Sequence, residues 1–252
     1  MTNASFRPSH YLVRVEDLPQ AVRDYEAAGF NVVWGSDPQT AHNALIYFDS
    51  GGFIELFNPV ATGAIAVVQK AVAKIGAAAG QPLLQRMNHW LKSRGLCDFA
   101  LESDVLEVAR EEIVESGMRL TKTRDFSRRQ ANGVVTRWQL CAPRESQLPF
   151  LMGPYTPAPE ITDTQRQHPN GIRRIQGLDI QHPHPTWYAD QLAQLFANKA
   201  TVVNGERIRV ELEDGFVFSI VEAQQWGLNA LITDTSPPAD AILHGLSLLQ
   251  PR

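Results

Sequence analysis

Two side chains that can bind a metal ion or carry a proton stand in strand-like runs near the start of the chain: His10 in HYLVRV and Glu55 in FIELF. Because side chains of a strand alternate between its faces, Phe53, Glu55 and Phe57 share one face. An ionised carboxylate between two aromatic rings is costly to bury, so Glu55 then requires a cation, a strong donor or a route to solvent. The alternative is an edge strand on which Glu55 faces water.

The elements around these two residues form one unit. His10 starts a strand that runs to Val15. The His10 side chain points away from the apolar face of that strand. A helix begins at the N-cap Asp17 and ends at Gly29. A short strand at 31–34 and two strands joined by a hairpin at 49–52 complete a βαβββ unit that ends near Phe57.

The same order of elements recurs later in the chain. CDFALESDV at 97–105 stands against HYLVRVEDL, and the spacing from Cys97 to Asp104 equals that from His10 to Asp17, seven residues in each. A second helix ends at Gly117. Strands are predicted at 118–121, 134–141 and 149–153, with a basic turn at 128–129. The chain therefore contains a βαβββ unit that repeats every 80 to 90 residues or so.

Helical periodicity predicts a two-helix insertion between these units, a polar, proline-rich stretch predicts a linker after them, and a third unit follows. The third unit includes hairpin signals at 204–205 and 214–215 and a helix predicted at 239–249. We predict an α+β fold in which tandem βαβββ units curl into an open mixed-sheet barrel. The predicted divisions are paired units in 1–153 (1–58 and 95–153), the insertion 59–94, the linker 154–174 and the third unit 175–252.

Composition narrows the class of protein. The chain has 252 residues, of which 44% are hydrophobic and 20% charged, and a net charge of -4, so we expect no general affinity for nucleic acid or membranes. Two cysteines form no disulfide framework, and the segment MTNASFRPSH lacks the apolar core of a secretory signal. We therefore expect a cytoplasmic protein that binds a small molecule. The assembly to test is a homodimer.

The chain resembles the vicinal oxygen chelate superfamily, which includes glyoxalase I, extradiol dioxygenases and antibiotic-resistance proteins. The resemblance rests on HYLVRVEDLPQAVRDYEAAGF, HNALIYFDSGGFIELF, the Trp138-containing strand, LPFLM and HPNGI at 168–172, and it covers most of the chain. It is closest to the glyoxalase-like branch. In that superfamily two units form an open barrel, and each supplies a His and a Glu to one divalent metal.

The resemblance implies metal ligands at His10 and Glu55, which the first unit keeps. In the second unit Cys97 stands at the place of the His, and 149–153 offers no carboxylate. A third ligand could come from Cys97 or from His42, although a buried thiol and a capping histidine are the alternative roles. Imidazole and carboxylate suit Fe(II), Mn(II), Ni(II) or Zn(II). Since the ligand set is incomplete, a protein without metal is the other expectation.

Further candidates would contact a ligand. Arg129 could hold an anionic group, and the alternative is a solvated arginine. His168 and Asn170 lie in the HPNG loop, which could serve a site or simply form a turn. The residues expected to line a substrate cavity are Phe53, Phe57, Phe99, Arg129, Trp138, His168 and Asn170, with Glu55 and His42 as acid/base groups.

Two functions follow from these residues. One is a glyoxalase-like lyase, isomerase or dioxygenase that acts on a small carbonyl or aromatic compound, with a metal holding neighbouring substrate oxygens. The other is a metal-free protein that sequesters a small aromatic compound, as resistance proteins of the superfamily do.

Overall fold

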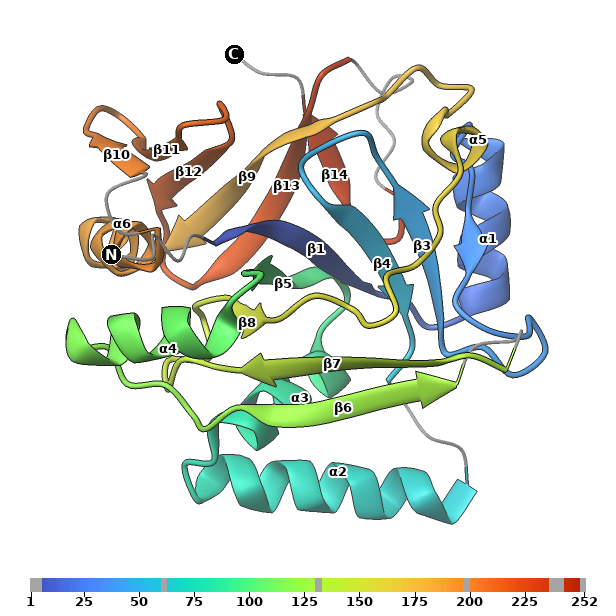
Figure 1. The fold of residues 1–252 in the computed structure, drawn as a ribbon, viewed down its shortest axis with the longest axis horizontal. Coiled ribbons are helices and arrows are strands. Elements are labelled where there is room, and N and C mark those ends of the chain that lie inside the picture. Colours follow the sequence, from blue (N-terminus) through green and yellow to red (C-terminus); the bar gives the residue numbers. More distant parts are fainter. Residues whose placement is uncertain (1–5, 60–62, 130–132, 197–199, 236–242, 250–252) are drawn as a thin grey trace.

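The computed structural model describes residues 6–59, 63–129, 133–196, 200–235 and 243–249. The strands of these residues form two sheets (Figure 1). The eight-stranded sheet has the order β2-β3-β4-β1-β5-β8-β7-β6 and curls into an open half-barrel. The six-stranded sheet has the order β10-β11-β12-β9-β13-β14. The predicted α+β fold of tandem βαβββ units is confirmed.

The first unit occupies one half of the curled sheet. Its helix starts at Asp17, whose carboxylate accepts a hydrogen bond from the Gln20 N–H at 2.9 Å, as an N-cap does. Gly51 and Gly52 have φ angles of +84° and +91°, which permit the tight turn before the last strand. The elements are β1 (Arg7–Arg14), α1 (Leu18–Ala27), β2 (Val33–Trp34), β3 (Asn43–Tyr47) and β4 (Phe53–Phe57).

The second unit forms the other half. Strand β5 runs antiparallel to β1 and brings Phe99 opposite Tyr11, while β4 and β8 lie parallel to β1 and β5 on either side. The two units are therefore joined edge to edge at their first strands. The elements are β5 (Gly95–Glu102), α4 (Leu106–Glu115), β6 (Arg124–Arg129), β7 (Val135–Cys141) and β8 (Phe150–Met152).

One predicted strand of this unit is wrong. Residues 118–121 contribute only an isolated β-bridge between Leu120 and Pro143, and the strand lies instead at Arg124–Arg129, where a basic turn was expected. Strand β6 is a mostly exposed edge strand of sequence RDFSRR, held by its pairing with β7. A sequence with one hydrophobic residue in six carries little of the alternation by which strands are predicted.

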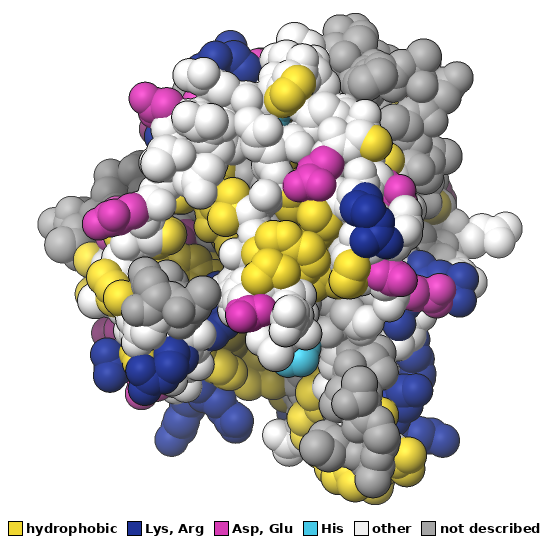
Figure 2. Space-filling view, turned by 90° about the vertical axis from the view of Figure 1, so that its right-hand side faces the viewer, with side chains coloured by type: hydrophobic (Ala, Val, Ile, Leu, Met, Phe, Trp, Pro, Cys, Tyr) yellow, Lys and Arg dark blue, Asp and Glu magenta, His cyan; other side chains and the backbone are white. Residues whose placement is uncertain are grey.

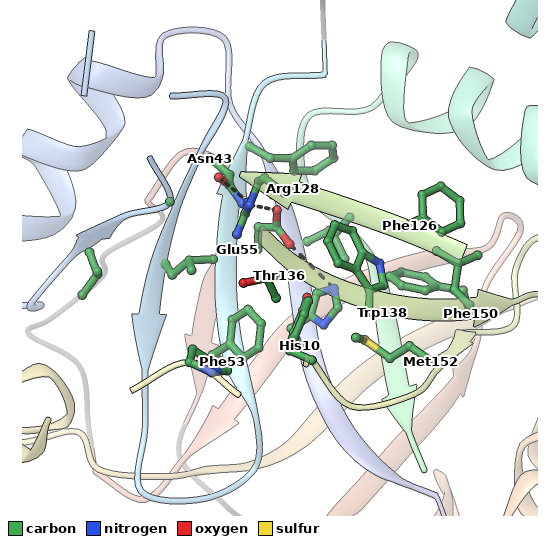
Figure 3. Close-up of a pocket in the computed structure, with 18 of the residues that line it drawn as sticks. His10, Asn43, Phe53, Glu55, Phe126, Arg128, Thr136, Trp138, Phe150 and Met152 are labelled. Carbon is green, nitrogen blue, oxygen red and sulfur yellow. Dashed lines mark hydrogen bonds and ion pairs between the residues drawn. The ribbon is translucent and has the colours of Figure 1, made fainter. Parts of the chain in front are cut away.

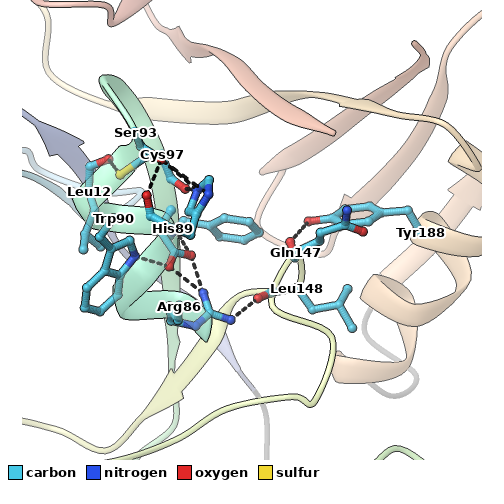
Figure 4. Close-up of polar contacts among 11 residues, drawn as sticks. Leu12, Arg86, His89, Trp90, Ser93, Cys97, Gln147, Leu148 and Tyr188 are labelled. Carbon is cyan, nitrogen blue, oxygen red and sulfur yellow. Dashed lines mark hydrogen bonds and ion pairs between the residues drawn. The ribbon is translucent and has the colours of Figure 1, made fainter. Parts of the chain in front are cut away.

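The insertion forms a helical hairpin of α2 (Gly63–Ala78) and α3 (Pro82–Lys92) beneath the curled sheet (Figure 1). Helix α3 is fixed to β5 by Arg86, whose Nη1 donates to both carboxylate oxygens of Asp98 at 2.5 and 2.6 Å (Figure 4). Arg86 Nη2 donates to the Leu148 carbonyl, and Trp90 Nε1 donates to Asp98, both at 2.6 Å. The insertion is thus anchored through a buried ion pair.

The third unit builds the smaller sheet. Its predicted C-terminal helix is wrong where the structure describes it: residues 247–249 form a strand parallel to β13, and 236–242 lie outside the described residues. His244 and Gly245 have φ angles of +50° and +79°, and two successive left-handed residues end any right-handed helix. The elements are β9 (Ile175–His182), α6 (Pro185–Leu195), β10 (Ala200–Val203), β11 (Ile208–Leu212), β12 (Val217–Glu222), β13 (Gly227–Thr233) and β14 (Ser247–Leu249).

The hydrophobic core lies between the two sheets and is continuous across them. Phe99 of β5 meets Phe218 of β12 with ring centroids 5.8 Å apart, and helices α1, α4 and α6 contribute further buried residues. The convex face of the curled sheet is therefore packed. Its concave face remains for the cavity described next.

Candidate functional site

The concave face of the eight-stranded sheet encloses a cavity of about 820 Å³. Strands of both units line its wall, and α3 of the insertion covers one side. Most of the lining is apolar, and it includes the rings of Phe53, Phe57, Trp90, Phe126, Trp138 and Phe150. A concave, largely aromatic cavity with few polar groups is the usual form of a small-molecule site.

His10 reaches this cavity from β1 and is almost completely buried, with 4% of its surface exposed. Its Nε2 lies 3.7 Å from Glu55 Oε2 (Figure 3). The ring stacks on Phe53 at a centroid distance of 4.9 Å, and Ser9 Oγ lies 3.3 Å from Nδ1. Burial lowers the pKa of His10 to about 3, so the imidazole is neutral near pH 7.

Glu55 projects into the cavity from β4, an interior strand between β3 and β1, and not from an edge strand. Asn43 Nδ2 donates to Glu55 Oε1 at 2.6 Å, and Arg128 Nη1 donates to Asn43 Oδ1 at 2.9 Å. Burial raises the pKa of Glu55, whereas the hydrogen bond from Asn43 and the charge of Arg128 oppose this rise. Arg128, Asn43, Glu55 and His10 thus form one polar row along the cavity wall (Figure 3).

The donor set of the polar row is incomplete for a resident metal ion. His10 and Glu55 offer one nitrogen and one oxygen, and no group of three His, Cys, Asp or Glu side chains suited to a metal occurs among the described residues. Cys97 does not line the cavity; its buried thiol donates to the Leu12 carbonyl at 3.5 Å, and burial raises its pKa. Strand β8, of sequence FLM, brings no carboxylate. The chain supplies half of the implied ligands.

Of the other expected residues, the structure places Phe53, Phe57 and Trp138 in the cavity. Phe99 is not there, because its side chain faces the core on the convex side of the sheet. His42 is exposed and does not line the cavity. Arg129 points away from it and donates to the Gly133 carbonyl at 3.0 Å. The neighbouring residue of the strand, Arg128, faces inward instead.

The HPNG loop makes structural contacts. His168 Nδ1 accepts from the Asn31 N–H at 3.0 Å, and its Nε2 lies 2.9 Å from the Tyr47 carbonyl, to which it donates. Asn170 donates to the Ala28 carbonyl at 3.1 Å. Neither side chain lines the cavity. The loop binds the linker to the first unit.

Several lining residues were not predicted. Asn43 and Tyr47 lie on the cavity face of β3, Thr136 lies near the polar row (Figure 3), and Tyr155 interacts electrostatically with Glu55 and Arg128. Alternation offered a signal for Arg128, because Arg124, Phe126 and Arg128 fall on one face of β6 and all line the cavity. The prediction of a turn at 128–129 hid this alternation, because it assigned Arg128 to no strand face.

Paired βαβββ units that share a concave cavity define the chain as a member of the vicinal oxygen chelate superfamily. More narrowly, the chain belongs to the glyoxalase-like domain family, whose profile matches residues 9–196. No curated protein matches the sequence.

Solved structures share the fold at low sequence identity. A hypothetical protein from Staphylococcus aureus is 13% identical with a TM-score of 0.71, over 96% of this chain and 98% of that one. The Mn(II)-bound glyoxalase from Novosphingobium aromaticivorans is 10% identical with a TM-score of 0.51, over 91% of this chain and 65% of that one. The 2,3-dioxygenase LapB from Pseudomonas sp. KL28 is 11% identical with a TM-score of 0.52, over 92% and 76%.

Proposed function

We propose that the cavity binds a small aromatic or carbonyl compound and that Glu55 exchanges a proton with it. The observation that carries this proposal is the polar row in a largely apolar cavity of about 820 Å³. The aromatic walls favour a planar, apolar body. The polar row orients the functional group of that body toward Glu55.

Three members of the polar row, Asn43, Glu55 and His10, have distinct tasks. Glu55 Oε1 is held by Asn43, which leaves Oε2 for the ligand and for His10. A carboxyl group with a raised pKa is a better base near neutral pH than an ordinary carboxylate. The neutral His10 ring is fixed against Phe53. One of its nitrogens is therefore held where it would form a hydrogen bond with a carbonyl or hydroxyl group of the ligand.

The test combines binding with proton exchange. A thermal-shift screen of α-ketoaldehydes, catechols and aromatic antibiotics would find ligands, since a compound that binds only the folded state raises the melting temperature. For a carbonyl ligand, NMR in D₂O then follows exchange of its α hydrogens. We expect exchange with the native protein, a loss of at least 100-fold in Glu55→Gln, and no change in Glu26→Gln, an exposed glutamate of α1. Equal exchange in Glu55→Gln would contradict the proposal.

The second candidate function is sequestration of an aromatic compound without chemistry. The apolar lining and the incomplete ligand set favour it. In the screen, ligands that stabilise the protein but exchange no hydrogen support sequestration. A divalent ion on His10 and Glu55 stays a prediction. Arms with Mn(II), Ni(II) or Zn(II) test it, because stabilisation only in the presence of metal would support the metal-dependent enzyme.

A further inference from the structure

Helix α2 carries a large apolar surface that no described residue covers. Val67, Val68, Val72 and Ile75 are 70%, 61%, 47% and 69% exposed. The spacing of Val68, Val72 and Ile75 places them on one face of the helix, and Val67 lies next to that face. Isolated exposed apolar residues are common, but four on one 16-residue helix form a patch that requires an explanation.

The charge of the insertion is unlike that of the rest of the chain. Residues 59–94 contain five Lys or Arg and no Asp or Glu, and two of the five, Arg86 and Arg94, form ion pairs with Asp98 and Glu16. Since the net charge of the chain is -4, the remaining residues carry -9. Lys70 and Lys74, one turn apart, are exposed and have no carboxylate partner among the described residues. The net charge of the whole chain, from which no membrane affinity was expected, conceals that the insertion is basic and the rest of the chain is acidic.

The other face of α2 is occupied. It packs on α3, where a Cβ at Gly76 would collide with the Leu84 side chain, so the two helices are in close contact. Figure 1 places α2 at the lower edge of the molecule, and Figure 2 shows hydrophobic side chains gathered at that end. The exposed face of α2 therefore points outward from the molecule, with the lysines along one margin.

From the apolar patch and the basic charge together, we propose that α2 docks on an anionic membrane surface. A helix with an apolar face bordered by lysines lies in the lipid interface: its aliphatic side chains enter the acyl boundary and its lysines reach the anionic headgroups. No described helix is long and apolar enough to span a membrane, so α2 lies on the surface. Each lysine near an anionic leaflet increases binding about fivefold.

A second copy of the chain is a poorer occupant of this face. In a two-fold dimer through α2, the insertion offers no carboxylate to pair with the lysines of the other copy. Docking also has a consequence for the cavity, because α3, which packs on α2, contributes Leu83, Met87 and Trp90 to its lining. A membrane-bound α2 would hold the cavity close to lipid, where apolar compounds concentrate.

Vesicle co-sedimentation of the full chain tests the proposal. Vesicles of phosphatidylcholine and phosphatidylglycerol at 7:3 are compared with pure phosphatidylcholine, at 0.1 and 0.5 M NaCl. We expect at least fivefold more binding to the anionic vesicles, reduced by the higher salt. The variants Val68→Gln/Val72→Gln/Ile75→Gln and Lys70→Gln/Lys74→Gln should each lower this binding at least fivefold.

The matched control is Val105→Gln/Val108→Gln/Val114→Gln. These valines are 46%, 39% and 42% exposed at or beside α4, whose charged residues are mostly glutamates. The control should bind vesicles like the native protein. Equal binding to both vesicle types, or no loss in either α2 variant, would overturn the proposal. Light scattering without lipid tests whether a second copy of the chain covers this face instead. If the native protein is a dimer and Val68→Gln/Val72→Gln/Ile75→Gln is a monomer, a second copy covers the face and the proposal is wrong.

Discussion

Asn43 links two charged residues of the cavity, Glu55 and Arg128, since it donates to the first and accepts from the second. This amide donates to the Glu55 carboxylate at 2.6 Å, and it limits how far burial can raise the pKa of that group. Proton affinity at Glu55 is therefore adjusted by a residue that need not touch the ligand.

Asn43→Leu should raise the pKa of Glu55 further, because the carboxylate loses its hydrogen bond and Arg128 loses its fixed position. A ¹³C-NMR titration of the Glu55 carboxyl carbon measures this directly. Gln39→Leu removes an exposed amide from the loop before the same strand and should leave the titration unchanged. An unaltered pKa in Asn43→Leu would mean that burial alone sets the proton affinity.

His10 should make the protein less stable in acid. Its pKa is lowered to about 3 in the folded state, against 6.5 for the ordinary group. Between these values the unfolded chain binds a proton that the folded chain does not, so stability falls as pH drops below 6.5. Glu55 has a raised pKa and acts in the opposite sense: its contribution to the stability of the protein is lost as the pH rises above 4.5, the ordinary pKa of a glutamate.

Urea denaturation at pH 8 and pH 5 measures the effect of His10. The single histidine should lower the free energy of unfolding by about 2 kcal/mol between these pH values. His10→Gln should remove that difference. His168 and His182 also have lowered pKa values, but they are unchanged in the variant and cancel in the comparison. A variant with the full native pH dependence would contradict the assignment to His10.

At this scale the sequence predicts the residues that follow from strand alternation. Phe53, Glu55 and Phe57 share the cavity because side chains two apart in a strand fall on one face, and His10 pairs with Phe53 on the neighbouring strand. Phe99 was placed wrongly because a strand with two apolar faces does not reveal which face meets a cavity. The pairing of Asn43 with Arg128 joins residues 85 positions apart, and such a contact is set by the folded sheet.

Among the elements, α3 is anchored to β5 through a buried ion pair. Arg86 and Asp98 have side chains 2% and 3% exposed, and the same carboxylate also accepts from Trp90. Charges this deeply buried are stable only while both partners are present. The helix that covers the cavity is therefore held by a contact that a single substitution can break (Figure 4).

Arg86→Leu should destabilise the protein by about 3–5 kcal/mol, because it leaves the Asp98 carboxylate buried without its cation. Arg86→Leu/Asp98→Asn should recover at least half of this loss, since the amide oxygen of the new Asn still accepts from Trp90. Arg94→Leu removes a largely exposed arginine that pairs with Glu16 and should cost less than about 1 kcal/mol. Urea denaturation gives all three values. If the double variant recovers none of the lost free energy of unfolding, the loss in Arg86→Leu comes from packing and not from the unpaired charge.

The sequence predicts elements where periodicity and caps agree, as at α1, but it misses elements held by their neighbours. Strand β6 has little hydrophobic alternation and exists because β7 pairs with it. At the C-terminus, Ile242, Leu246 and Leu249 have helical spacing, yet among residues 243–249, which the structure describes, Leu246 and Leu248 are the buried ones. Pairing with β13 determines this segment.

At the scale of the whole molecule, the two sheets share one core. The convex face of the curled sheet carries Phe99, and the facing sheet carries Phe218, which also contacts Phe196 of the segment after α6. The repeat of units was evident from the sequence, but the packing of the third unit on the first two was not, because apolar strand faces do not specify their partners. A shared core predicts that the sheets unfold together.

A double-mutant cycle tests this coupling. Phe99→Ala and Phe218→Ala should each destabilise the protein by about 3–5 kcal/mol, because each leaves a cavity in a well-packed core. The effects should be non-additive by about 0.5–3 kcal/mol, as is usual for residues in contact. Calorimetry should show a single transition in the native protein and in both variants. If Phe218→Ala instead produced a separate, earlier transition for the six-stranded sheet, the third unit would be an independent domain and the cavity-bearing sheet would not depend on it.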